Sequence, residues 1–416
     1  MSSSTEYNPV EVRRSFRLLA SDAILYNCGL AFLDQSTVLP AFLATLTGSS
    51  VLIGAIISIR TAGILLPQMW TAHYLRHRSR HKSFLVKVAL ISRISMALFA
   101  VLMFFAGPND RSLMLWGFLA MYTAFWFSEG AAGLSWTDLV AKAIPERKRG
   151  RLFGLMQFAG GILAILAGIF VSRMLSPSGP AYPRNYAVLA AVSAFFFAAS
   201  LSCLLPVREP EGAIEDHEGD FLDYVRKIGQ MLAGHRELQR FLAVQVLLGF
   251  FGLSLPFYIL YAKDTIEVGG GMVGIFLSVQ MAGSIAASAV TGYLSDRNGP
   301  KYAIMSAIFA GIFASVFSLL IAGSGVWMYG ILFFAVGWVI GSGWIGMTNY
   351  LLELAEPSER KSYLGLMNTV SVPTMVFPIL GGLIVETVSY HAVFALTGLA
   401  FVVALVLAFG LKSSDS

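Results

Sequence analysis

Runs of apolar residues alternate with short polar loops along the whole chain. Each run is about 20 residues long, which is the length that an α-helix needs to cross a lipid bilayer. The pattern predicts about twelve membrane-spanning helices, divided equally by a polar stretch at 207–240. The spans before that stretch are expected at 22–46, 51–70, 84–106, 112–136, 152–175 and 185–206, and those after it at 241–263, 272–293, 302–323, 326–350, 363–386 and 392–411.

This pattern predicts an all-α membrane protein made of two six-helix bundles, at residues 1–206 and 241–416. The connector at 207–240 opens with acidic residues. Its apolar residues then recur at helical spacing, at Phe221, Val225, Ile228 and Leu232. The spacing predicts an amphipathic helix that lies at the membrane surface and tethers the two bundles. A regulatory segment is the alternative for this stretch.

Composition agrees with a membrane protein. Of the 416 residues, 56% are hydrophobic and 13% are charged, whereas soluble proteins have about 25% charged residues. The net charge of +5 comes from basic loops, so it does not indicate nucleic-acid binding. Cys28 and Cys203 both fall inside apolar runs, and neither a disulfide framework nor a metal site is expected.

Lysine and arginine are concentrated in the loops on one side of the predicted spans. Such loops face the cytoplasm in membrane proteins, so both termini and the connector are expected there. The polar N-terminal residues contain no signal-peptide hydrophobic segment, and the first span is expected to insert uncleaved. The sequence therefore predicts a multi-pass protein of the cell membrane.

The two predicted bundles contain an internal repeat. The loop YLRHRSRHK at 74–82 aligns with YLSDRNGPK at 293–301, and the apolar runs before these loops align as well. The aligned pairs include Gly54 with Gly274, Gly63 with Gly283, Tyr74 with Tyr293, Arg78 with Arg297 and Lys82 with Lys301. Pro40 and Pro256 interrupt the first span of each half, where breaks or kinks are expected.

This combination resembles the major facilitator superfamily, and the resemblance covers nearly the whole chain. The superfamily has a signature loop after its second span, roughly G-x-x-x-D-R/K-x-G-x-R/K. The second copy here fits it with Gly292, Asp296, Arg297, Gly299 and Lys301. The first copy retains only Arg78 and Lys82, and His77 stands where the aspartate is expected.

In the superfamily this loop latches the cytoplasmic side shut. The resemblance implies that Asp296 lies against the positive N-terminal end of a neighbouring helix. Neutral His77 cannot replace that anion, so the first latch is expected to be weakened or pH-dependent. The alternative is that the histidines of this loop are ordinary basic surface residues.

Ionisable residues inside the spans are the candidates for coupling chemistry, because they are costly in hydrocarbon and usually paired. Asp34 and Arg60 lie mid-span at a shared depth, and Glu129 and Arg93 lie in the fourth and third spans. One hypothesis is that Asp34 binds a proton while Arg60 keeps it ionised or binds an anionic substrate. The other is a static ion pair. Glu129 is either a functional carboxylate or a structural partner of Arg93. Three acids, Asp22, Asp138 and Glu386, are expected at the membrane interfaces.

The resemblance implies that the first, fourth, seventh and tenth spans line a central cavity. The polar and aromatic candidates, which include one from the eighth span, are Asn27, Tyr122, Ser254, Tyr258, Gln280, Trp338, Ser342 and Asn349. The arginine that related proton-coupled transporters have in the fourth span is replaced by Trp126. We expect Trp126 either to pack in the core or to stack on a flat solute.

We therefore expect a secondary active transporter, not an enzyme, which moves a small organic solute by alternating access. A proton is the expected coupling ion and no other cofactor is expected. Export of amphipathic compounds, a lipid or lysolipid flippase, and a non-transporting receptor on the same scaffold are the alternatives. A monomer in the lipid bilayer, with a small-molecule substrate and no nucleic acid, is expected.

Overall fold

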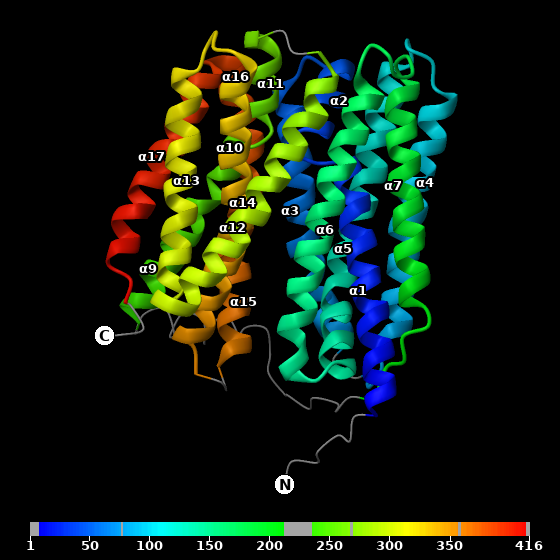
Figure 1. The fold of residues 1–416 in the computed structure, drawn as a ribbon, viewed down its shortest axis with the longest axis vertical. Helices are drawn as coiled ribbons and strands as arrows, with labels where there is room; N and C mark the ends of the chain where they lie inside the picture. Colours follow the sequence, from blue (N-terminus) through cyan, green and yellow to red (C-terminus); the bar gives the residue numbers. More distant parts are fainter. Residues whose placement is uncertain (1–7, 76–77, 212–234, 267–268, 357–358, 413–416) are drawn as a thin grey trace. The chain divides into compact units, whose positions relative to one another are not determined.

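The computed structural model describes residues 8–75, 78–211, 235–266, 269–356 and 359–412. These residues are almost entirely helical (Figure 1). The helices of the first half are α1 (Pro9–Phe32), α2 (Val38–Leu46), α3 (Ser50–Leu75), α4 (Lys82–Phe105), α5 (Arg111–Ala143), α6 (Glu146–Leu175) and α7 (Arg184–Leu204). Those of the second half are α9 (Arg236–Gly249), α10 (Phe251–Ser254), α11 (Phe257–Ile266), α12 (Gly271–Asn298), α13 (Pro300–Leu320), α14 (Val326–Leu354), α15 (Arg360–Ser371), the 3₁₀ segment η1 (Val372–Val376), α16 (Phe377–Thr387) and α17 (Tyr390–Phe409).

Ten helical segments of the described chain are long and apolar enough to cross a membrane, and they coincide with ten of the twelve predicted spans. The first and fourth predicted spans are helical too, as α1 with α2 and as α5. The all-α fold is confirmed. The amphipathic helix predicted in the connector falls on residues 212–234, which lie outside the described residues.

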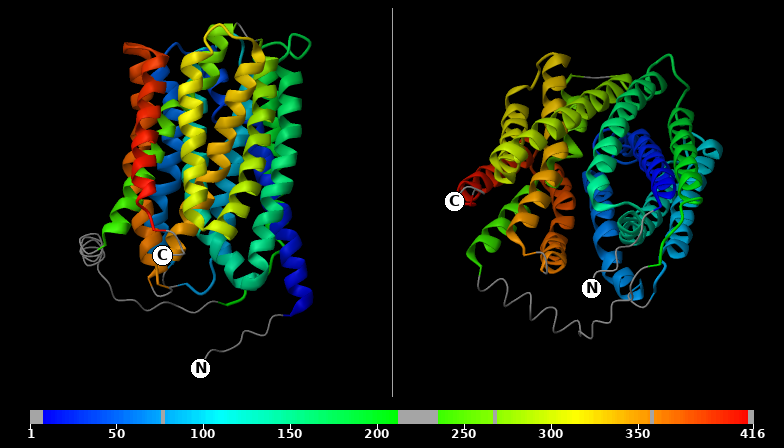
Figure 2. Two further views of the ribbon diagram at one scale, coloured as in Figure 1. Left: turned by 60° about the vertical axis from the view of Figure 1, so that its left-hand side comes forward. Right: turned by 60° about the horizontal axis from the view of Figure 1, so that its bottom comes forward.

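The chain forms two compact units. The first comprises residues 1–33, 62–167 and 179–216, and its α4 packs against α5 and α7 while α1 packs against α7. The second comprises residues 34–61, 168–178 and 217–416. It therefore contains α2, the beginning of α3 and the end of α6 together with the helices of the second half. Within each unit the long helices run roughly along one direction (Figure 2).

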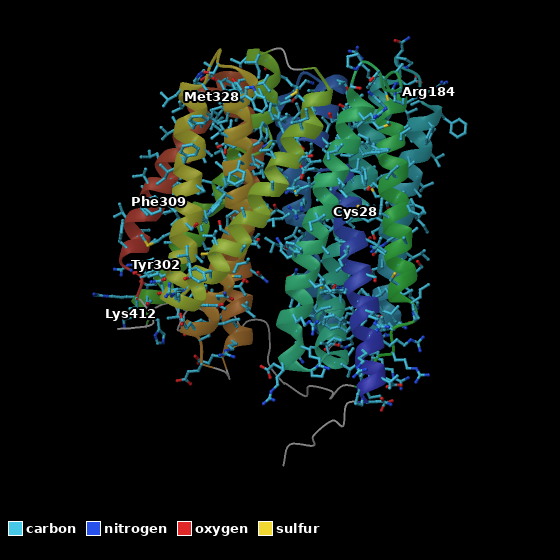
Figure 3. The ribbon with its side chains drawn as sticks, viewed as in Figure 1. Cys28, Arg184, Tyr302, Phe309, Met328 and Lys412 are labelled. Atoms are coloured by element: carbon cyan, nitrogen blue, oxygen red, sulfur yellow. The ribbon has the colours of Figure 1, made fainter. Side chains whose placement is uncertain are left out.

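One face of α4 shows how the surface suits lipid. Its exposed residues are apolar and recur at helical spacing, at Leu90, Ile91, Ile94, Leu98 and Val101. An apolar strip of this length is unfavourable in water and favourable in hydrocarbon. In the second unit, Met328 marks one end of the helices and Tyr302 and Lys412 mark the other (Figure 3).

The first span of each half is broken, as the two prolines predicted. The chain leaves helical geometry between Phe32 and Val38, just before Pro40, and again at Phe250 and around Leu255 before α11. A proline near the start of a helix costs little because the first N–H groups have no intrahelical partner. The helix that contains the start of the first predicted span extends beyond it toward the N-terminus, since α1 already begins at Pro9, where the Asn8 side chain caps it.

Glycines at aligned positions make equivalent close contacts in both halves. A Cβ on Gly54 would lie 2.1 Å from the carbonyl oxygen of Pro378 in α16, and one on Gly274 would lie 2.1 Å from the backbone nitrogen of Ser172 in α6. Each contact joins a helix of the first half to a helix of the second half within the second unit. Only glycine permits backbones to approach so closely.

Candidate functional site

Asp34 lies at the break between α1 and α2 and holds the turn that leads into the second of these helices. Its Oδ1 accepts hydrogen bonds from the backbone N–H groups of Ser36 and Thr37, both at 2.9 Å. It also accepts the hydroxyls of the same residues, at 2.6 and 2.8 Å. A carboxylate that accepts neighbouring backbone and hydroxyl donors in this way stabilises a tight turn. Asp34 therefore has a structural role in addition to the predicted coupling role.

The second half approaches this break through Gln280 on α12. The Gln280 amide donates to the Ser36 hydroxyl at 2.8 Å, and its side chain is fully buried. Gln280 aligns with Arg60, which is half-buried on α3. The contacts described for Asp34 are those with Ser36 and Thr37, so its ion pair with Arg60 stays a prediction.

Glu129 and Arg93 form a buried ion pair between α5 and α4. Arg93 Nη1 contacts Glu129 Oε1, and the two side chains are only 9% and 12% exposed. Ser92 Oγ lies 2.5 Å from the same carboxylate oxygen and 2.7 Å from Arg93 Nη1. The predicted pairing of Glu129 with Arg93 is confirmed. Trp126, one turn earlier on α5, is packed edge-on to Phe125 in the core.

A second carboxylate, which the sequence did not single out, lies next to this pair. Asp22 on α1 is 4% exposed, so it is buried among the helices of the first unit. Its Oδ1 accepts the Ser200 hydroxyl of α7 at 2.6 Å, and its Oδ2 accepts the Trp136 indole N–H of α5 at 2.9 Å. Arg93 Nη2 lies 3.4 Å from that same serine oxygen. Four helices of the first unit thus meet at Arg93 and Asp22.

A cavity of about 240 Å³ lies inside the second unit, between α9, α10, α13, α14 and α15. Its lining residues among those described contain no ionisable group. Gln245 donates to the Ser371 hydroxyl at 3.2 Å at its edge, and methionines 347 and 367 give it an adaptable apolar surface. Such a cavity suits a neutral, mostly apolar group with one hydrogen-bonding function.

None of the predicted lining residues is among the described residues that line this cavity. On α14 the cavity is lined by Val339 and Gly343, which directly follow the predicted Trp338 and Ser342. Trp338 instead donates to Ser306 at 2.8 Å, and Ser342 is fully buried. The remaining predicted residues divide into the buried Tyr122, Ser254 and Tyr258 and the exposed Asn27 and Asn349.

The two aligned loops make the same contacts in each half. The guanidinium of Arg78 lies over the ring of Tyr74 at 4.4 Å, and that of Arg297 lies over the ring of Tyr293 at 5.6 Å. The ammonium groups of Lys82 and Lys301 each donate to two carbonyl oxygens at the end of a helix. Lys82 binds Leu205 and Val207, just after α7. Lys301 binds Phe409, the last residue of α17, and Leu411 beyond it.

The remaining signature residues differ from each other in their surroundings. Gly299 has a φ of 93° at the turn between α12 and α13, where glycine is favoured. A Cβ added to Gly292 would have no described atom within 4 Å, so close approach does not explain this glycine. Asp296 is exposed. His77 lies outside the described residues, and its latch hypothesis stays a prediction.

The first loop is bound by a carboxylate from another segment of the chain, Glu209 after α7. The carboxylate of Glu209 accepts the backbone N–H groups of His81 and Lys82, both at 2.8 Å, at the start of α4. Lys142 lies 3.2 Å from Glu209 and 2.6 Å from Asp138, and Asp138 lies 2.7 Å from His81. Burial acts to raise the pKa of Glu209, but the two backbone donors and Lys142 outweigh it and lower that pKa below its usual value.

Residues 240–415 match the family model of the Major Facilitator Superfamily. The second half of the chain therefore matches the major facilitator superfamily. Members of this superfamily are transporters rather than enzymes, so the family indicates transport of some solute. The multidrug resistance protein MdtG of Dickeya zeae (strain Ech586) is 28% identical over 166 residues, which cover 38% of this chain. The match spans only 40% of that relative's length.

Solved superfamily structures agree with this fold over nearly the whole chain. A mutant of the nucleoside transporter NupG matches with a TM-score of 0.74 at 14% identity, over 95% of this chain and 99% of its own. A bacterial homologue of the iron transporter ferroportin, in an inward-facing state, matches with a TM-score of 0.72 at 12% identity, over 96% and 98%. At such low identity the likeness shows the fold alone.

The sequence contained one signal that would have located Asp22. Asn8 followed by Pro9 is a typical helix start, with a capping side chain and proline in the first turn. A helix that begins there places Asp22 almost four turns inside it, among apolar residues. Ser200 and Trp136 carried no comparable signal, because serine and tryptophan are common in membrane helices and only packing brings them to Asp22.

Proposed function

We propose that this protein is a secondary active transporter that moves a small organic solute by alternating access and is coupled to protons. The observation that carries the proposal is the Arg93–Glu129 ion pair in the interior of the first unit. Burying ionisable groups in a membrane protein costs at least about 2.5 kcal/mol each, so such groups are retained mainly for function. A carboxylate that alternates between this arginine and a proton would couple solute movement to a proton gradient.

Contacts within the second unit support alternating access. The Gly54–Pro378 and Gly274–Ser172 approaches join helices of the two sequence halves. They are small, backbone-to-backbone contacts, which can separate without exposing large side chains. We infer that they close the membrane side opposite the basic loops, and that both termini lie in the cytoplasm.

The cavity favours a neutral, moderately apolar solute, because the described lining lacks charge. The relatives bear names of a nucleoside transporter and of a multidrug resistance protein. A nucleoside-sized solute and an amphipathic compound both fit this chemistry. Export of amphipathic compounds or of lysolipid is therefore the second candidate, supported by the apolar, methionine-containing lining.

The test is reconstitution into liposomes with an imposed pH gradient and a panel of nucleosides, amphipathic dyes and lysolipids. We expect gradient-driven flux in the parent and its loss in Glu129→Gln. Glu146→Gln is the matched control, since the same change is made to an exposed carboxylate at the start of α6. Unchanged gradient-driven flux in Glu129→Gln would refute the coupling role. Solute binding without flux would favour a receptor.

Two variants at Asp34 separate its structural and coupling roles. The side-chain oxygen of asparagine can accept the same hydrogen bonds in a turn as that of aspartate, so Asp34→Asn should preserve the turn and remove only the titratable group. Asp34→Ala removes both. If only Asp34→Ala lowers flux and thermal stability, then the contribution of Asp34 is to hold the turn before α2. If Asp34→Asn abolishes gradient-driven flux with stability intact, Asp34 takes part in coupling.

A further inference from the structure

Asp22 is a buried carboxylate that takes no part in the Arg93–Glu129 ion pair. It lies beside an apolar cluster of the first unit that includes Ala23 and Leu139. Both of its oxygens accept hydrogen bonds from neutral donors, Ser200 and Trp136. A carboxylate that is ionised but paired only with neutral groups is costly at such a place.

Ser200 connects Asp22 to the arginine of the ion pair. Its oxygen lies 2.6 Å from Asp22 Oδ1 and 3.4 Å from Arg93 Nη2. Arg93 Nη1 is engaged by Glu129 and Ser92. Arg93 Nε has no hydrogen-bond partner among the described residues although the side chain is only 9% exposed. The guanidinium thus holds one donor that its present partners do not use.

The charges around Asp22 do not balance if both acids are ionised. The groups that face it are Arg93 from α4, Glu129 and the Trp136 indole from α5, and the Ser200 hydroxyl and the Cys203 thiol from α7. Two carboxylates and one permanently charged guanidinium give a net charge of −1 in a buried site. One bound proton makes the cluster neutral.

We propose that Asp22 and Glu129 share a single proton, and that Arg93 pairs with whichever carboxylate is ionised. In the structure Arg93 pairs with Glu129, so the proton resides on Asp22. A serine hydroxyl both donates and accepts, so protonated Asp22 Oδ1 donates to Ser200 Oγ without any change in the heavy atoms.

The alternative arrangement exchanges these roles. Arg93 turns its donors toward Asp22 as the shared proton passes from Asp22 to Glu129, which at 12% exposed is the less buried acid. Net charge is conserved at each stage. The assignment of this exchange to solute coupling rests on the proposed function, whereas the shared proton itself does not.

Infrared spectroscopy of the purified protein at neutral pH tests the proton site without any solute. A protonated carboxylic acid absorbs at a higher frequency than a carboxylate. We expect such a band in the parent and in Asp34→Asn, and its loss in Asp22→Asn. In Arg93→Gln, where neither acid has a cation, the band should grow about twofold as both acids become neutral.

Ser200→Ala is the second variant, and it retains Asp22 if Asp22→Asn does not fold. It removes the hydrogen-bond partner of the protonated acid, so the band should move to higher frequency, whereas Ser202→Ala, an exposed serine on the same helix, should leave it in place. Persistence of the band in Asp22→Asn, or no shift in Ser200→Ala, would overturn the proposal. Absence of proton-driven flux in the parent would remove the proposed function and leave the band unaffected.

Discussion

Gly274→Ala tests whether the close helix contacts of the second unit control a conformational equilibrium. A Cβ at this position would lie 2.1 Å from the Ser172 backbone nitrogen and 2.3 Å from the Gly168 carbonyl oxygen. Ordinary van der Waals contact begins near 3.4 Å, so α6 and α12 must separate by roughly 1 Å at this point. Both clashing atoms belong to backbone and cannot rotate away.

The expected magnitude follows from this overlap. Overpacking a well-packed contact costs about 1–3 kcal/mol. If the contact exists in only one of two transport conformations, that cost shifts the equilibrium away from the closed one by about 5–150-fold. Gly154→Ala on α6, the helix against which Gly274 packs, is the control, because no described atom lies within 4 Å of its Cβ position. Both changes alter helix propensity by a similar amount.

Thiol labelling measures the shift without a known substrate. Ser172→Cys is introduced next to the contact, in a background in which Cys28 and Cys203 are replaced by serine, and its reaction with a membrane-impermeant maleimide is timed. We expect faster labelling with Gly274→Ala and with the aligned Gly54→Ala than with Gly154→Ala. Equal rates in all three would refute the reasoning, because the clash would then have been absorbed without opening.

Further predictions concern the loops and the break in the first span. Glu209→Gln should lower the melting temperature above about pH 4.5, the ordinary pKa of this group. The difference in melting temperature from the parent should vanish as the pH falls through the lower pKa of the folded state. A difference that persists in acid would contradict the assigned cause. Lys301→Met and Lys82→Met should each lower local stability by about 1–3 kcal/mol and speed hydrogen exchange at the ends of α17 and α7. Lys148→Met, at an exposed site, should do neither. Ser36→Ala leaves the buried Gln280 amide without its partner and should lower stability by about 1–3 kcal/mol, measured by thermal unfolding against Ser202→Ala; equal melting temperatures would show that Gln280 finds another partner.

The sequence alone predicted the spans, the repeat and the resemblance to the superfamily. The length of an apolar run is a local property, since a helix must satisfy its own backbone hydrogen bonds in lipid. Repeat pairs such as Lys82 with Lys301 make equivalent contacts, because equivalent residues in two copies of one fold meet equivalent neighbours. The pairing of Arg93 with Glu129 was also predictable, because buried charges in membranes require partners.

Only the tertiary structure decided which side of each helix is used. Successive residues point about 100° apart, so the choice between Trp338 and Val339 as a cavity residue depends on how α14 is rotated in its bundle. The contacts of Asp34 depend on where the first span breaks, and the burial of Asp22 depends on how α1 packs against α5 and α7. Contacts between residues as distant in sequence as Asp22 and Ser200 arise from packing, and no local pattern in the chain encodes them.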